Sequence, residues 1–309
     1  MPSTRRTFLA QSTALAATAY LAPRAAFAAP SPHVNFPTAP RDRICVASYP
    51  FRYVIQGQDA RATSPIDLKD FAAHIKEKFQ INKIEPWTGH FPTPTSKYLD
   101  QFHTALQKSG CHIANMAVDG EDSPYARDPA ERARALAFSK KWINVAARLN
   151  APGVRTNIPA AKDSQPDLTR AADTLREAAD YAARKNVVIS LENDNPVSED
   201  PFFLVQLVEK VNSPWLHTLP DFANSLTAHD DDYAYRGIDA MFSRAYSICH
   251  VKETEVNPAG QPVHADLPRT FGYLKQHDYK GYLSMEWDSP GDPYAGTQDL
   301  IEKTVRYLS

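Results

Sequence analysis

The sequence is poor in cysteine, which excludes one way of stabilising a protein. Three cysteines, Cys45, Cys111 and Cys249, occur in 309 residues. The number is odd, and each of them lies in an apolar, strand-like stretch. This pattern argues against a disulfide framework and predicts buried free thiols.

The sequence also lacks an excess of basic residues. It has 34 Lys and Arg against 36 Asp and Glu, a formal net charge of -2. The N-terminal segment contributes three arginines and no acid, so the rest of the chain carries about -5. An acidic surface disfavours nucleic acids and anionic membranes as partners. A metal-dependent endonuclease, which needs a basic face and extra histidines, is disfavoured too.

No apolar run near the N-terminus is long enough for a membrane span. Residues 8–21 are fewer than the roughly 20 apolar residues that a span requires. Arg5 and Arg6 precede this run, and a small-residue pattern ends at Ala28. This arrangement is typical of a twin-arginine export signal. We expect residues 1–28 to be a signal peptide and the mature protein to be periplasmic or secreted, with no membrane span.

Glycine is scarce as well, with 11 residues in the chain. The turn after the first expected strand, SYPFRYVIQGQDARA, is not glycine-rich. A doubly wound dinucleotide-binding sheet usually carries glycines there, so that fold is disfavoured.

Strand-like and helix-like stretches alternate along the rest of the chain. Residues 29–42 form a proline-rich linker, and residues 43–309 contain eight strands, each followed by a helix. This count predicts a single (β/α)8 TIM barrel. The expected strands are residues 43–51, 81–87, 111–119, 153–158, 187–192, 216–222, 246–253 and 281–288. The expected helices are residues 64–79, capped by Ser64, then 96–110, closed by Gly110, 128–150, 167–186, 200–212, 230–245, 266–278 and 297–309.

Four successive strands of the second half end in residues that bind metals. They are Glu192, Asp221, His250 and Glu286. The carboxyl ends of barrel strands meet at one rim, and neighbouring strands are about 4.8 Å apart, so these side chains can converge. Three carboxylates crowded together without a cation would raise each other's pKa. The sequence therefore predicts one divalent metal bound by these four residues.

The same segments carry a family resemblance over essentially the whole chain after the signal. LEND, PDFAN, HVKE and MEWD, with SYPFR and IEPWTGHF, resemble the sugar phosphate isomerase/epimerase family of xylose isomerase-like TIM barrels. The resemblance implies that Glu192, Asp221, His250 and Glu286 bind Mn²⁺, with Mg²⁺, Co²⁺ or Zn²⁺ as alternatives. It also implies that Glu192 and Glu286 act as acid and base in a sugar isomerase or epimerase working through an enediolate. Members often form homo-oligomers.

Two positions depart from the ketose epimerases of that family. Asn224 stands where those enzymes have a histidine that touches the substrate, so the resemblance makes Asn224 a candidate substrate-binding residue. Lys252 follows His250 without a nearby arginine. These departures make a free ketose a less favoured substrate. The expected substrate is still a sugar or a cyclitol with a carbonyl group. A lyase or dehydratase acting on a keto-sugar, keto-glycoside or inosose is an alternative, and a non-catalytic sugar-binding protein is another.

Further strand-end residues are candidates for the pocket around the metal. Lys252 lies two residues after His250, on the same side of an ideal strand, and is either a catalytic or substrate-binding group or a solvated lysine. Arg155 either holds a substrate oxygen or pairs with an acid. Trp87 and His90 are candidates for a sugar platform and a polar contact, although a buried tryptophan is the commoner case. We expect Asn193 and Asp194 to support the ligands, and Glu85, if it faces the interior, to need a partner.

Overall fold

The structure is a computed structural model that describes residues 31–198 and 200–309. The expected signal peptide, residues 1–28, lies outside the described residues. None of the helices in the described part of the chain has the length and apolar character of a membrane span.

Parallel strands form the inner layer of the barrel. In chain order they are β1 (Ile44–Ala47), β2 (Lys83–Glu85), β4 (Met116–Val118), β5 (Gly153–Thr156), β6 (Val188–Glu192), β7 (Leu216–Leu219), β8 (Ile248–Val251) and β11 (Tyr282–Met285). They pair in two parallel arcs, β2–β1–β11–β8 and β4–β5–β6–β7. Backbone bridges between Trp87 and Ala117 and between Asp221 and His250 join the arcs. The closed ring confirms the predicted (β/α)8 fold.

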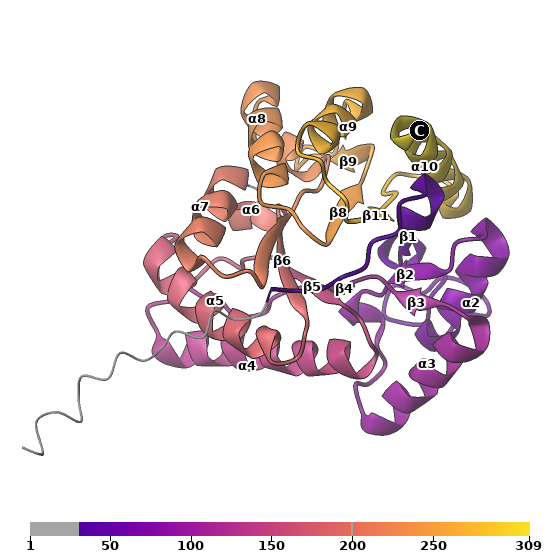
Figure 1. Ribbon diagram of the computed structural model, residues 1–309, viewed down its shortest axis with the longest axis horizontal. Coiled ribbons are helices and arrows are strands. Elements are labelled where there is room, and N and C mark those ends of the chain that lie inside the picture. The colour runs from indigo at the N-terminus through magenta and orange to yellow at the C-terminus, as the bar shows by residue number, and fades with distance from the viewer. Residues whose placement is uncertain (1–30, 199) are drawn as a thin grey trace, which may run out of the picture. The chain divides into compact units, whose positions relative to one another are not determined.

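Helices surround the strands, as Figure 1 shows. The long ones are α2 (Leu68–Phe79), α3 (Ser96–Ser109), α4 (Pro129–Arg148), α5 (Leu168–Ala183), α7 (Pro201–Val211), α8 (Asp231–Phe242), α9 (Leu267–Gln276) and α10 (Pro293–Leu308), and α6 (Asn195–Ser198) is a single turn. An aspartate side chain accepts hydrogen bonds from the first backbone N–H groups of every long helix except α3. Such caps satisfy donors that a helix start otherwise leaves free.

Several boundaries differ from the sequence-based expectation. Helix α2 is capped by Asp67 and not by Ser64, because the backbone of Ile66 still pairs with Ile55 before the helix begins. Gly110 does end α3, in the left-handed conformation that favours glycine. The third expected strand is split into β3 (His112–Ile113) and β4, and α10 begins at Pro293 because Asp292 caps it.

An unexpected hairpin follows β8 at the carboxyl end of the barrel. It consists of β9 (Thr254–Val256) and β10 (Pro262–His264), which pair antiparallel. Its turn contains Gly260 in a positive-φ conformation. The hairpin brings residues 254–256 next to the ends of β8 and β11, where the candidate site lies.

The segment expected to be a linker lies against the amino end of the barrel. Phe36 packs edge-on against Tyr246, before β8, and against Tyr282, in β11, with ring centroids 5.5 and 5.4 Å apart. Tyr246 also donates a hydrogen bond to the carbonyl of Pro32. Residues 31–309 accordingly form one compact unit.

The three cysteines are free and buried, as predicted. Cys45 lies in β1, Cys249 lies in β8 and Cys111 directly precedes β3. Each therefore serves as a small apolar side chain of the core.

Candidate metal centre

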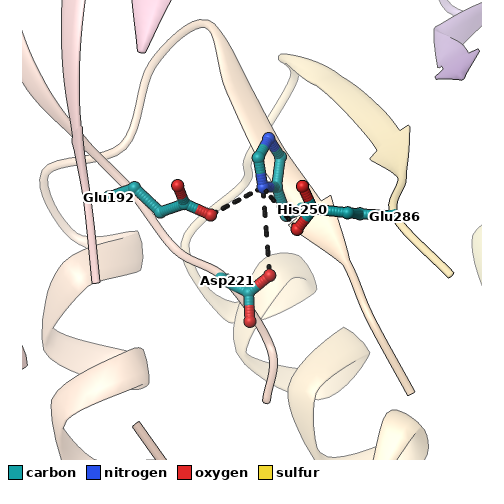
Figure 2. A group of neighbouring side chains, drawn as sticks. All are labelled: Glu192, Asp221, His250 and Glu286. Carbon is teal, nitrogen blue, oxygen red and sulfur yellow. Dashed lines mark ion pairs between the residues drawn. The ribbon is translucent and has the colours of Figure 1, made fainter. Parts of the chain in front are cut away.

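The predicted ligand residues lie where four successive barrel strands end. Glu192 is the last residue of β6, Asp221 follows β7, His250 lies in β8 and Glu286 directly follows β11. All four side chains are buried. One donor atom from each lies within 4.8 Å of the others. Figure 2 shows the three carboxylates turned toward one nitrogen of the imidazole ring, Nδ1.

Nδ1 of His250 is the common point of this cluster. It lies 2.7 Å from Glu192 Oε1, 3.2 Å from Glu286 Oε2 and 3.9 Å from Asp221 Oδ2. Glu192 and Glu286 approach from opposite sides of the ring (Figure 2). A ligand held here would therefore have a carboxylate on each side.

Glu85 fixes the other edge of the imidazole. Glu85 Oε2 lies 2.9 Å from His250 Nε2, and Asn115 donates to Glu85 Oε1 at 2.7 Å. Glu85 ends β2 and is fully buried. When Nε2–H donates to this carboxylate, the lone pair of Nδ1 faces the cluster, which is the tautomer that a metal requires. The sequence predicted that Glu85 would need a partner if it faced the interior, and its partners are His250 and Asn115.

Hydrogen bonds leave Asp221 with one free oxygen. Its Oδ1 accepts from the backbone N–H groups of Ala223 and Asn224, both at 2.8 Å. The side-chain amide of Asn193 makes two hydrogen bonds to the backbone of Asp221. It accepts from Asp221 N at 2.7 Å and donates to Asp221 O at 3.1 Å. Oδ2 remains to face His250.

Without a cation, the buried carboxyl groups differ in how readily they ionise. Burial raises the pKa of Asp221 to about 7, although the nearby Lys252 opposes the shift. Burial also raises the pKa of Glu192, despite the opposing charges of Arg155 and His250. Burial acts on Glu286 too, but Lys252 and His250 outweigh it and hold the pKa of Glu286 well below its ordinary value.

The free atoms of the cluster fit a divalent cation. Glu192 Oε1 and Oε2, Asp221 Oδ2 and His250 Nδ1 are buried and have no hydrogen-bond partner. Such atoms are rare in folded proteins, and here they converge. Glu192 Oε2 faces Arg155, and a divalent ion would supply a partner to the other three atoms and would offset the carboxylate charge. The residues present therefore fit the predicted metal.

Lys252 is buried beside the cluster and is not a solvated lysine. Its Nζ lies 3.0 Å from Glu286 Oε2 and 3.8 Å from Asp221 Oδ2. It also donates to Asn224 Oδ1 and to Glu255 Oε2, both at 3.0 Å. Burial lowers the pKa of this amine, but Asp221, Glu286 and Glu255 outweigh burial and hold the pKa well above its ordinary value.

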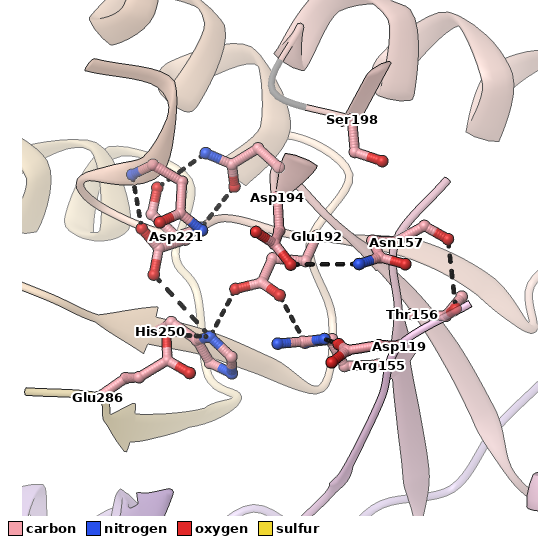
Figure 3. A network of polar contacts seen from close by, with 12 residues as sticks. Asp119, Arg155, Thr156, Asn157, Glu192, Asp194, Ser198, Asp221, His250 and Glu286 are labelled. Carbon is pink, nitrogen blue, oxygen red and sulfur yellow. Dashed lines mark hydrogen bonds and ion pairs between the residues drawn. The ribbon is translucent and has the colours of Figure 1, made fainter. Parts of the chain in front are cut away.

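Arg155 occupies the opposite side, beside Glu192. Arg155 Nε lies 2.5 Å from Glu192 Oε2, and the same guanidinium pairs with Asp119. Asp119 in turn accepts from Trp87 Nε1 at 2.6 Å. Figure 3 shows Glu192 between His250 and Arg155. Each glutamate of the cluster thus has a cationic neighbour, Arg155 for Glu192 and Lys252 for Glu286.

The candidate site opens into a cavity of about 380 Å³. Its lining contains six acidic and two basic side chains, an imbalance that a bound cation would reduce. Trp87, Arg155, Asn224 and Lys252, all predicted as pocket residues, line it.

Two predicted residues differ from their expected roles, and one of them, His90, does not line this cavity. His90 is buried behind Trp87, with ring centroids 4.9 Å apart, and its Nδ1 lies 3.0 Å from Ser48 Oγ. Burial lowers the pKa of His90 to about 4, so its imidazole is neutral. Asp194 lines the cavity but accepts its hydrogen bond from Asn157 and not from a ligand residue.

Three acidic residues of the lining were not predicted: Asp119, Glu255 and Asp288. Asp119 follows β4 and Asp288 comes two residues after Glu286. The strand-end rule that identified Glu192 would have identified Asp119. Glu255 lies on the unexpected β9, so its position depends on a hairpin that strand and helix alternation does not reveal.

Solved structures share this fold at low sequence identity. A xylose isomerase-like TIM barrel protein from Mycobacterium smegmatis in complex with magnesium is 17% identical, with a TM-score of 0.63, over 85% of this chain and 96% of that one. D-allulose 3-epimerase from Methylomonas sp. is 18% identical, with a TM-score of 0.66, over 89% of this chain and 100% of that one. The 3-keto-D-glucoside 4-epimerase from E. coli is 14% identical, with a TM-score of 0.61, over 85% and 98%.

The sequence itself places the chain in a family. No curated protein matches it significantly. The sequence model of the family described as xylose isomerase-like TIM barrel matches residues 76–308, which include every candidate ligand. With that match over most of its length, the protein belongs to the xylose isomerase-like TIM barrel family.

Proposed function

We propose that this protein is a divalent-metal-dependent enzyme that isomerises or epimerises a sugar by moving a proton next to a carbonyl. The observation that carries the proposal is the convergence of donor atoms from four buried residues within 4.8 Å of one another, beside a polar cavity. Three of these residues, Glu192, Asp221 and His250, contribute atoms without a hydrogen-bond partner. The names of two similar structures, a D-allulose 3-epimerase and a 3-keto-D-glucoside 4-epimerase, support the reaction class.

The ligand set favours Mn²⁺. Glu192, Asp221 and Glu286 offer carboxylate oxygens, and His250 offers one imidazole nitrogen. Oxygen-rich sites with one nitrogen suit Mn²⁺, Mg²⁺ or Co²⁺ better than thiolate-seeking metals. A divalent ion bound there would polarise a carbonyl and lower the pKa of the adjacent C–H group.

The protein's own side chains can hold and move the proton. Glu192 and Glu286 lie on opposite sides of His250, so one can remove a proton from one face of a substrate carbon while the other returns a proton to the opposite face (Figure 2). Lys252 Nζ, 3.0 Å from Glu286 Oε2, is a fixed positive charge for a substrate oxygen on that side. Arg155 supplies the equivalent charge beside Glu192.

Isotope exchange and elemental analysis test this function together. The purified protein, with Mn²⁺ added, is incubated in D₂O with D-fructose, D-allulose, D-tagatose and methyl 3-keto-β-D-glucoside. We expect elemental analysis to find one divalent metal ion per chain. We also expect at least one of the sugars to take up one deuterium without losing water or any other group. Glu286→Gln and Glu192→Gln should each reduce exchange at least 100-fold, because each removes a proton-transfer group. Glu177→Gln, an exposed change on α5, is the matched control.

Three outcomes would contradict the proposal in different ways. Absence of bound metal, together with no rise in melting temperature on adding Mn²⁺, would remove the metal site. Loss of water or of the methoxyl group from the sugar would identify a lyase. Sugar binding that Glu286→Gln leaves unchanged, without any exchange in the unmodified protein, would identify a binding protein.

A further inference from the structure

A second cavity lies beside the one above the metal centre. Its volume is about 600 Å³, against about 380 Å³ for its neighbour. Three segments line it: residues 50–61 after β1, residues 255–256 of the β9–β10 hairpin, and residues 287–293 after β11. We call this second cavity the outer groove.

The outer groove is continuous with the candidate site. Glu255, Val256 and Asp288 line both cavities. Asp288 pairs with Arg52, a groove residue, at 2.8 Å, and it follows Glu286 by two residues. A molecule bound at the metal centre can therefore extend into the groove without leaving the protein surface.

The lining of the groove is more apolar than that of the candidate site. Among the side chains that the structure describes, Tyr53 and Val256 are the large hydrophobic ones that remain exposed, at 36% and 44%. Both line the groove, together with the partly exposed Trp287. Concentration of exposed apolar surface in one place is a sign of a binding site.

The aromatic walls are held in place. The guanidinium of Arg61 lies 3.9 Å from the centre of the Tyr53 ring, and that of Arg52 lies 4.9 Å from it. The indole of Trp287 packs against α10 so closely that a Cβ on Gly296 would lie 2.1 Å from Trp287 Nε1. Walls fixed in this way can receive a ring without first being ordered.

The charges in the groove argue against a phosphate or carboxylate group there. Arg52 is paired with Asp288, and Arg61 covers Tyr53. Glu255 and Asp288 add negative charge. A neutral ring with an apolar face matches both the aromatic walls and this charge balance.

We propose that the outer groove is a subsite for a second ring, joined by a glycosidic bond to the sugar that occupies the metal centre. This inference rests on the proposed function and narrows its substrate class to glycosides in place of free monosaccharides. One ring lies at the four candidate ligands, and Tyr53, Val256 and Trp287 contact the other.

Binding of two stable glucosides tests the subsite without requiring turnover. Phenyl β-D-glucoside and methyl β-D-glucoside differ only in the group that would enter the groove. With the Mn²⁺-loaded protein we expect calorimetry to give at least tenfold tighter binding of the phenyl compound. Tyr53→Ala should remove most of that preference and leave methyl glucoside affinity unchanged, because Tyr53 lines the outer groove and not the cavity of the candidate site. Val256→Glu should also remove most of the preference for the phenyl compound. Tyr181→Ala, on α5, is the control for loss of a tyrosine.

If the Tyr53→Ala protein does not fold, Val256→Glu still tests the subsite, because Val256 is an exposed residue whose replacement leaves the core intact. Equal affinity for the two glucosides, or a phenyl preference that survives both changes, would overturn the subsite. Conversion of a dimer into monomers by both changes, seen by light scattering, would overturn it in favour of an interface between copies of this chain. Failure of the proposed function is seen separately, as absent Mn²⁺ binding and absent deuterium exchange.

Discussion

Glu85 determines which nitrogen of His250 faces the other candidate ligands. It accepts from the imidazole edge that points away from the cluster, at 2.9 Å, and Asn115 holds it there. Carboxylates in this position raise the basicity of a ligating histidine, and their loss weakens metal binding about 10- to 100-fold. We expect Glu85→Gln to weaken Mn²⁺ binding by about that factor, measured by calorimetry. Glu302→Gln, exposed on α10, is the matched control. Unchanged Mn²⁺ affinity in a folded Glu85→Gln protein would show that the charge of Glu85 plays no part.

The candidate ligands could be predicted from sequence because each lies at or near the carboxyl end of a strand. The positions of the residues around them depend on side-chain packing, which strand position does not predict. Glu192, Asp221 and Glu286 end or follow strands, and parallel strands place their carboxyl ends at one rim. His90 was predicted to contact the substrate, but it lies outside the cavity because the ring of Trp87 packs against it. Local sequence does not encode that packing.

At the scale of single elements, α2 shows how one charged cap links stability to pH. Asp67 accepts from Lys69 N at 3.0 Å and from Tyr98 Oη at 2.7 Å. Partial burial raises the pKa of Asp67, but the bonds from Lys69 and Tyr98 outweigh it and lower the pKa overall. A depressed carboxyl pKa stabilises the fold above the unfolded-state value, about 3.9, and that contribution is lost as pH falls through the folded-state value.

We therefore expect Asp67→Asn to be destabilising at neutral pH and progressively less so in acid. Urea unfolding at pH 7 and near pH 3.5 measures the difference in unfolding free energy between variant and parent. That difference should be largest at pH 7 and shrink at the lower pH. Asp70→Asn, in the exposed first turn of the same helix, controls for charge alone. A difference that is constant with pH would contradict the assigned role of the Asp67 charge.

Two helical glycines give a matched pair of opposite predictions. Alanine is intrinsically better than glycine in a helix by about 1 kcal/mol. In α9, a Cβ on Gly272 would meet nothing within 4 Å, so Gly272→Ala should stabilise by roughly 0.5–1 kcal/mol. In α10, a Cβ on Gly296 would lie 2.1 Å from Trp287 Nε1, and overpacking of this kind costs about 1–3 kcal/mol.

Gly296→Ala should consequently lower the free energy of unfolding and reduce the preference for phenyl β-D-glucoside, because Trp287 must move. Denaturant unfolding and calorimetry on both variants check this. A Gly296→Ala protein that gains stability as Gly272→Ala does would show that Trp287 is not held against α10.

Elements with strong periodicity were predicted well, and the β9–β10 hairpin was not. Its strands have three residues each, and most of their side chains are exposed or half-buried. The signal in the sequence was the turn segment NPAG, residues 257–260, between two short strand-like stretches. Short exposed strands carry little hydrophobic pattern, so only the turn chemistry could have indicated them.

For the whole molecule, eight strand and helix alternations specified the barrel, because each amphipathic helix and each apolar strand must bury one face against the next layer. The alternation did not specify how the amino end is closed. Phe36 contributes to that closure through its contacts with Tyr246 and Tyr282, at the end of the barrel opposite the candidate ligands. The two ends of the barrel should therefore respond independently to mutation.

Phe36→Ala tests this independence. Each lost aromatic pair contributes about 0.5–1.5 kcal/mol beyond area burial, and Phe36 is half-buried, so we expect a loss of roughly 1–3 kcal/mol in unfolding free energy. Mn²⁺ affinity should not change, and the double variant with Glu85→Gln should show additive effects within about 0.5 kcal/mol. Denaturant unfolding and calorimetry measure the two quantities. His33→Ala, exposed on the same segment, should leave both unchanged. Weaker Mn²⁺ binding by a folded Phe36→Ala protein would show that closure of the amino end shapes the metal centre through the strands.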